Sequence, residues 1–138
     1  MMDNPSRLLK VSRYVLEPSV SGLALVREFL KATLMPFPPA QPHVYDILSA
    51  THEACKNAIE HDPVARHPVD VACKVFEDVV VVKVSDRGNG FDPDILPPQP
   101  PDPEATTGWG LFLIYSLMDN VDIETGRDGT WVTMTKRL

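Results

Sequence analysis

Three polar residues in the first half of the chain, Glu53, Asn57 and His61, are spaced four residues apart. In an α-helix this spacing places the three side chains on one stripe. An Asn oxygen can help to hold Mg²⁺, and a Glu one turn earlier can accept a proton from an attacking hydroxyl. The alternative is a solvated polar face, which these three residues alone favour. His61 also lies beside the predicted end of the helix and could instead cap it.

Two glycine-containing segments follow this predicted helix. Residues 86–90 leave a run of valines, and an Asp at a strand end can accept a hydrogen bond from an exocyclic amine such as that of adenine. Residues 107–111 precede another predicted helix, whose free N–H groups and positive dipole end favour phosphate. Each segment alone is also ordinary turn or helix-start chemistry, and neither is a Walker A loop. Together with the Glu53–Asn57 helix, in one small domain, they favour a site for Mg-ATP.

The bulk composition is that of one ordinary globular domain, residues 1–138, with 43% apolar and 23% charged residues. A formal charge of −6 gives no basic footprint of the kind that indicates nucleic-acid binding. Cys55 and Cys73 lack the spacing of a zinc site, so we expect two reduced, buried thiols. The N-terminus has no apolar stretch typical of a signal peptide, and no run reaches the roughly 18 apolar residues of a membrane span. We therefore expect a soluble, cytoplasmic protein.

The hydrophobic periodicity predicts an order of β-α-α-β-β-loop-α-β-β. The predicted elements are an edge strand over residues 7–16, a helix from residues 18–19 to the proline-rich segment 35–42, a helix over 43–61, strands over 69–76 and 79–84, a helix over 110–119, and strands over 121–125 and 130–137. We expect the valine run 79–84 to be a central strand buried on both faces, or nearly so. Residues 77–78 and 126–129 are expected to turn two hairpins. The fold class is α+β: a two-layer sandwich with a mixed, mostly antiparallel sheet and helices on one face.

Four segments carry a family resemblance: EACKNAIEH, VSDRGNGFD, TGWGLFLIYSLMDNV and GTWVTMTKRL. In order and spacing they resemble the ATP-binding boxes of the anti-sigma-factor serine kinases, which are cytoplasmic regulators of bacterial stress and sporulation sigma factors. Those kinases belong to the GHKL superfamily of ATPases and kinases. The resemblance runs in detail from Val44 to the C-terminus. It implies the Bergerat ATP-binding fold, binding of ATP and Mg²⁺, and serine/threonine-protein kinase activity.

The resemblance also implies a role for each matching residue. Glu53 matches the general base, and Asn57 matches the Mg²⁺ ligand. Asp86 matches the acid that binds the adenine amino group, and Thr130 matches a Thr of the closing hairpin near the base of the nucleotide. The other matches shape the wall of the adenine site or bind on the phosphate side of the nucleotide: Gly88, Gly90, Thr106, Thr107, Gly108, Trp109, Gly110 and Leu111.

Members of this family phosphorylate a serine of a small antagonist, a STAS-type anti-anti-sigma factor, and hold a sigma factor inactive, usually as homodimers. One feature of this sequence departs from the family pattern. Residues 104–107 are Glu-Ala-Thr-Thr, where family members often carry a basic residue that meets the terminal phosphate. Positive charge normally stabilises a transferring phosphoryl group. An alternative is therefore an ATP-binding anti-sigma module with little or no kinase activity.

Three further expectations concern segments around the predicted site. The proline-rich residues 92–107 are expected to form a non-helical cover over the phosphates, or else a disordered surface loop. The first predicted helix, with Arg27, Glu28 and Lys31 exposed, is either a partner-binding element or an ordinary solvated face. A two-component histidine kinase would need a phospho-accepting His on a dimerising helix pair. We expect no such pair, because only one predicted strand precedes the first helix.

Overall fold

The computed structural model describes residues 6–19, 21–60, 67–87, 103 and 109–138. Its elements follow the predicted order, with one additional short helix. They are β1 (Leu8–Leu16), α1 (Gly22–Leu34), the 3₁₀-helix η1 (Pro38–His43), α2 (Val44–Glu60), β2 (Val69–Phe76), β3 (Val79–Asp86), α3 (Trp109–Leu117), β4 (Asn120–Gly126) and β5 (Gly129–Arg137).

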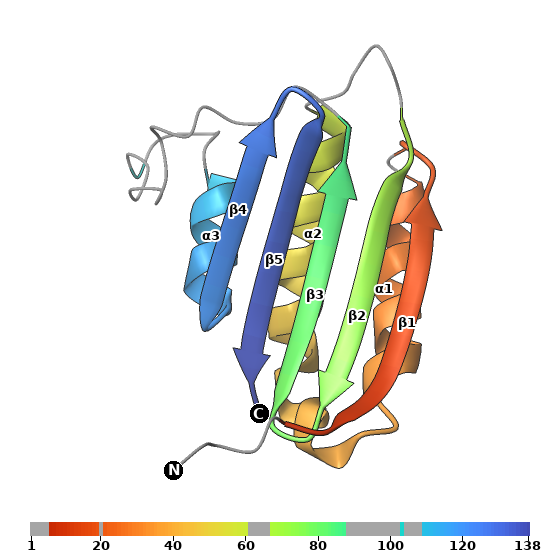
Figure 1. Ribbon diagram of the computed structural model, residues 1–138, viewed down its shortest axis with the longest axis vertical. Coiled ribbons are helices and arrows are strands. Elements are labelled where there is room, and N and C mark those ends of the chain that lie inside the picture. The colour runs from red at the N-terminus through yellow and green to blue at the C-terminus, as the bar shows by residue number, and fades with distance from the viewer. Residues whose placement is uncertain (1–5, 20, 61–66, 88–102, 104–108) are drawn as a thin grey trace.

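The strands form one five-stranded sheet in the order β1-β2-β3-β5-β4. Every neighbouring pair is antiparallel, whereas the prediction allowed a mixed sheet. Figure 1 shows α1, α2 and α3 together behind this sheet, so the predicted two-layer α+β sandwich is confirmed. The last strand, β5, enters between β3 and β4. In the C-terminal hairpin, β5 therefore pairs with the central strand β3, and β4 forms the edge of the sheet.

The central strand β3 has one buried face and one open face. Val80, Val82 and Val84 are buried towards the helices, while Val79 and Val81 on the other face are partly exposed. The prediction that this valine run is buried on both faces was wrong, because the helices cover only one side of the sheet. Valine is favoured in strands for its branched shape on either face, so a run of valines does not report which faces are covered.

The helices attach to the sheet through apolar stripes. α1 buries residues at spacings of three and four: Leu23, Val26, Leu30 and Leu34. α2 buries alanines four residues apart, which add little width between the helix and its neighbours: Ala50, Ala54 and Ala58. None of the helices in the described ranges has the length and apolar composition needed to cross a membrane.

Several element boundaries differ from the predicted ones. α1 begins at Gly22, later than predicted, and ends at Leu34, just before the prolines as expected. The proline-rich segment then forms η1, whose short 3₁₀ turns tolerate Pro38 at the start. β3 extends two residues further than predicted, because Ser85 and Asp86 continue the ladder with β5.

Both ends of the described chain are tied to the turn between β2 and β3. The backbone N–H of Glu77 donates to the Arg7 carbonyl at 3.1 Å, and the N–H of Leu138 donates to the Asp78 carbonyl at 2.9 Å. Asp86 and the β4–β5 turn lie at the opposite end of the sheet (Figure 1). The predicted adenine-binding end is therefore remote from both described chain ends.

Candidate functional site

Glu53 and Asn57 lie one helical turn apart on α2, on the side that faces α3. Gly110 is the second residue of α3, and a β-carbon added to it would lie 2.7 Å from Glu53 Oε2 and 3.6 Å from Asn57 Oδ1. The first of these distances is shorter than real β-carbon contacts, so a side chain at position 110 would displace the Glu53 carboxylate. The structure thus brings the predicted base, the predicted Mg²⁺ ligand and a predicted phosphate-loop glycine together.

The side chains of Glu53 and Asn57 are half-buried, and neither bonds to another side chain or backbone group within the described ranges. The first turn of α3, beside them, begins with backbone N–H groups that have no partner within the helix. Oxygen acceptors next to such donors suit a cation and an anion bound together. No group of three or more His, Cys, Asp or Glu in the described ranges could hold a metal alone. Mg²⁺ bound to a nucleotide needs only one or two protein ligands, so Asn57 fits that role.

Asp86 and Thr130 form the second half of the candidate site. They pair across β3 and β5, and their exposed fractions are 8% and 1%. Alternation along β3 puts Asp86 on the same face as Val82 and Val84, towards the helices. Thr130 shares a hydrogen bond of 3.1 Å with Thr125 through their hydroxyl oxygens. The Asp86 carboxylate therefore lies on the same side of the sheet as α2.

Gly129 supports Asp86 from the β4–β5 turn. Its φ of +134° lies in a region that side-chain-bearing residues avoid. A β-carbon there would also lie 1.9 Å from the Asp86 carbonyl oxygen. The sequence predicts only that Gly129 lies in a hairpin turn. Its position next to Thr130, which is predicted to lie near the base of the nucleotide, is the one sequence feature that indicates a role in the site.

Trp109 and Leu111 have different surroundings at the start of α3. Trp109 is 40% exposed, and its ring meets that of Phe112 edge to face, with ring centroids 5.9 Å apart. Leu111 belongs to the apolar core. Leu111 could therefore contact a nucleotide only through its backbone, while the side chain of Trp109 is accessible from the surface.

The remaining predicted site residues lie outside the described residues: His61, Gly88, Gly90, Thr106, Thr107 and Gly108. The proline-rich segment predicted to cover the phosphates also lies outside them, apart from Pro103, which is exposed. The described part of the site therefore comprises its α2 wall, the start of α3 and the β3–β5 end.

The described residues also form two hollows away from the contact at Gly110. One, of about 370 Å³, is lined mainly by the open face of the sheet and includes Asp86, Arg13, Lys83 and Trp131. The other, of about 420 Å³, lies between α1 and α2. Neither is lined by Glu53, Asn57 or Gly110. The Gly110 contact and the Asp86–Thr130 pair, not these hollows, define the candidate site.

The cysteines take no part in this chemistry. Cys55 and Cys73 are free thiols buried in the core, as predicted. Burial raises the pKa of each thiol to about 12. The nucleophilic thiolate is therefore scarce at neutral pH, although Cys55 lies between Glu53 and Asn57 in sequence.

Known proteins share both the sequence pattern and the fold. The family described as the histidine kinase-like ATPase domain matches residues 16–136. Serine-protein kinase RsbW of Bacillus velezensis is 35% identical over 105 residues, covering 69% of this chain and 65% of that protein. RsbW of Bacillus subtilis is 34% identical, and the match again covers 69% of this chain and 65% of that protein. RsbW of Staphylococcus aureus is 28% identical over 131 residues, covering 87% of this chain and 82% of that protein.

Two solved structures resemble the fold. One contains the RsbU and RsbW domains of a Mycobacterium tuberculosis protein, with a TM-score of 0.72 and 24% identity over 94% of this chain and 33% of that chain. The other is the histidine kinase domain of a blue-light-activated kinase from Erythrobacter litoralis, with a TM-score of 0.58 and 17% identity over 86% of this chain and 60% of that chain. At these identities the likeness shows the fold alone.

This chain spans about 65% of the length of the Bacillus relatives. From the match over residues 16–136, the chain belongs to the histidine kinase-like ATPase family, which implies ATP binding, and within that family it is RsbW-like.

Proposed function

We propose that this chain is an ATP-dependent serine-protein kinase and anti-sigma factor. In this proposal it phosphorylates a serine of a STAS-type anti-anti-sigma antagonist and sequesters a sigma factor. It acts as a cytoplasmic homodimer, and residues 1–138 form a single kinase domain. The similarity to proteins named serine-protein kinase RsbW supports this class of function. The observation that carries the proposal is the close approach of Gly110 to Glu53 and Asn57.

The proposed mechanism gives the residues on α2 and α3 separate tasks. Bound Mg-ATP supplies the terminal phosphoryl group and the cation that offsets its charge. Glu53 accepts the proton that the substrate serine loses as its oxygen bonds to the terminal phosphorus and ADP leaves. Asn57 holds Mg²⁺ through its side-chain oxygen. The backbone N–H groups at the start of α3, together with Gly108, bind the phosphates.

The β3–β5 end of the site has the task of orienting the nucleotide. Asp86 accepts a hydrogen bond from the adenine amino group, with Thr130 beside it on β5. Gly88 and Gly90 shape the same wall, and Thr106 and Thr107 donate hydrogen bonds on the phosphate side. Orientation of this kind lowers the barrier because the reacting groups are held in place before the transfer step.

Glu53→Gln tests the assignment of the base. We expect phosphoryl transfer to a STAS-type antagonist to fall by about 100-fold or more, since proton transfer by a positioned base contributes about 10² to 10⁴ in rate. ATP affinity should stay within about threefold, because Glu53 is assigned to the proton and not to the nucleotide. Labelled ATP measures transfer and calorimetry measures binding. Glu60→Gln, at an exposed position at the end of the same helix, is the matched control. Transfer at the parent rate by Glu53→Gln would rule out this role.

A second candidate function is an ATP-binding anti-sigma module without kinase activity. The observation that favours it is the sequence of residues 104–107, which contains no Lys or Arg to offset phosphoryl charge. Incubation with labelled ATP, a candidate antagonist and a sigma factor separates the two functions. Label on an antagonist serine excludes the binding-only module. ATP-dependent capture of the sigma factor without label on the antagonist supports it.

A further inference from the structure

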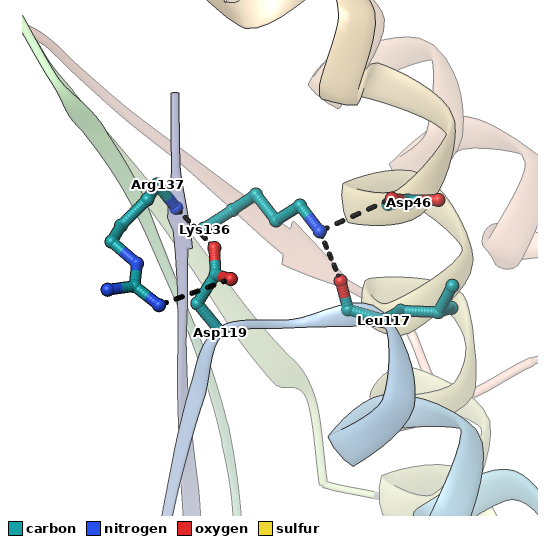
Figure 2. Close-up of polar contacts among 5 residues, drawn as sticks. All are labelled: Asp46, Leu117, Asp119, Lys136 and Arg137. Carbon is teal, nitrogen blue, oxygen red and sulfur yellow. Dashed lines mark hydrogen bonds and ion pairs between the residues drawn. The ribbon is translucent and has the colours of Figure 1, made fainter.

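The C-terminal end of α3 is held by the last strand of the sheet (Figure 2). Lys136 on β5 donates a hydrogen bond of 2.6 Å from Nζ to the carbonyl oxygen of Leu117, the last residue of α3. The same Nζ lies 3.3 Å from Asp46 Oδ2, in the first turn of α2. The Lys136 side chain is only 14% exposed, so water competes little for its ammonium group. One side chain thus connects β5 with both α2 and α3.

A separate set of contacts fixes Asp119, two residues beyond the end of α3 (Figure 2). Asp119 Oδ2 accepts the backbone N–H of Arg137 at 2.6 Å. The backbone N–H of Asp119 donates to the carbonyl of Thr135 at 2.9 Å. The chain is therefore anchored to β5 just beyond the helix. Within the helix, Leu111 and Ile114 pack in the apolar core, and the Lys136 contact with Leu117 adds a polar contact at the C-terminal end.

The contacts of α3 with α2 occur at matching positions along the two helices. The helices run antiparallel, because Lys136 links Asp46 to the end of α3 while Glu53 meets Gly110 at its start. Glu53 lies seven positions after Asp46, and Leu117 lies seven positions after Gly110. Each interval is about 10 Å along its helix axis. A short helix moves as one body, so a shift of its end at Leu117 also moves Gly110 relative to Glu53.

We propose that Lys136 is a positioning residue for the phosphate end of the nucleotide site. By holding the end of α3, it keeps Gly110 and the N–H groups of the first helical turn against Glu53 and Asn57. The consequence for nucleotides rests on the proposed function. Lys136 itself does not reach the adenine end, because Thr130 lies six residues back along β5, about 20 Å away.

Lys136→Met tests this proposal, since it keeps the aliphatic chain and removes the donor. We expect the affinity for ATP to fall about tenfold while the affinity for adenosine stays within twofold, because Asp86 and Thr130 are held by other contacts. A role in general stability alone would lower both affinities alike. Lys136→Arg keeps a donor for the Leu117 carbonyl and should restore most of the ATP affinity. Calorimetry with ATP and with adenosine gives both values.

Lys83→Met is the matched control, because Lys83 is an exposed lysine on the open face of the same sheet. It should leave both affinities unchanged. A second readout needs no nucleotide. Hydrogen exchange of the α3 amides should become at least fivefold faster in Lys136→Met, with β2 and β3 unaffected. Unchanged α3 exchange, or equal losses of ATP and adenosine affinity, would overturn the proposal. If the parent chain binds ATP but transfers no phosphate, the kinase function fails while the exchange and affinity measurements still test Lys136.

Discussion

The absence of a side chain at position 110 shapes the space between α2 and α3. The nearest atom to a β-carbon added there is the tip of Glu53, which is the flexible end of a side chain and not backbone. A substitution at this position therefore moves the proposed base before it strains the fold. A substitution at position 110 can therefore lower activity without lowering stability.

Gly110→Ala should lower phosphoryl transfer at least tenfold while changing the free energy of unfolding by less than about 1 kcal/mol. The new methyl group displaces the Glu53 carboxylate, but alanine is a better helix former than glycine by about 1 kcal/mol, which offsets the crowding. Transfer assays and urea denaturation measure the two effects. Ser116→Ala changes an exposed position of the same helix and serves as the control. Full activity in Gly110→Ala would show that the position of Glu53 does not govern transfer.

The turn between β4 and β5 does more than connect two strands. Gly129 brings its backbone against the Asp86 carbonyl, so the turn fixes the end of β3 from which Asp86 reaches the helix side. Gly126, on the other side of the same turn, has open space where a β-carbon would be placed. The two glycines of one turn therefore have unequal importance.

Gly129→Ala should lower the free energy of unfolding by about 2 kcal/mol or more and weaken ATP binding. The expected loss combines backbone strain at positive φ, of order 1–3 kcal/mol, with a collision against fixed backbone. Urea denaturation and calorimetry measure both quantities. Gly126→Ala should be close to the parent in both. Equal behaviour of the two variants would contradict the packing described at Asp86.

The elements themselves could largely be predicted because their apolar periodicity is regular. The apolar stripes of α1 and α2 follow from this periodicity. The turns at residues 77–78 and between 126 and 129 follow from the short polar or glycine-containing segments between the strand patterns. The end of β3 was missed because Ser85 and Asp86 look like turn residues in isolation. Their place in the strand depends on pairing with Trp131 and Thr130, far away in the sequence. Long-range pairing of this kind leaves little local signal.

At the scale of the whole molecule, the sequence predicted the two layers but not the order of the strands. The insertion of β5 between β3 and β4 is what brings Thr130 beside Asp86. The meeting of Gly110 with Glu53 likewise depends on how α3 packs on α2. The family resemblance implies roles for these residues, but it does not give their contacts. The sequence does not predict the contacts of Lys136, because a lysine near the end of a strand is usually a solvent-exposed surface residue.

The buried thiols report on the integrity of the whole fold. With pKa values of about 12, Cys55 and Cys73 should react negligibly with a thiol reagent at pH 8 in the native chain and rapidly in urea. Stability should also fall as pH rises from the ordinary thiol value of 9.0 towards 12, because the unfolded thiols ionise there and the folded ones do not. Colorimetric thiol counting and alkaline denaturation measure these effects. Rapid native labelling of both cysteines would contradict their burial.

Both described chain ends are fastened at the β2–β3 turn, while Asp86 and Thr130 lie at the other end of the sheet. The seven steps along β5 from Thr130 to Arg137 cover about 23 Å. A fluorophore, an affinity tag or a tether to a sensor surface attached near either described end would thus lie a full sheet length from the adenine end. Binding experiments on immobilised protein can therefore use either described end and keep the attachment away from Asp86 and Thr130.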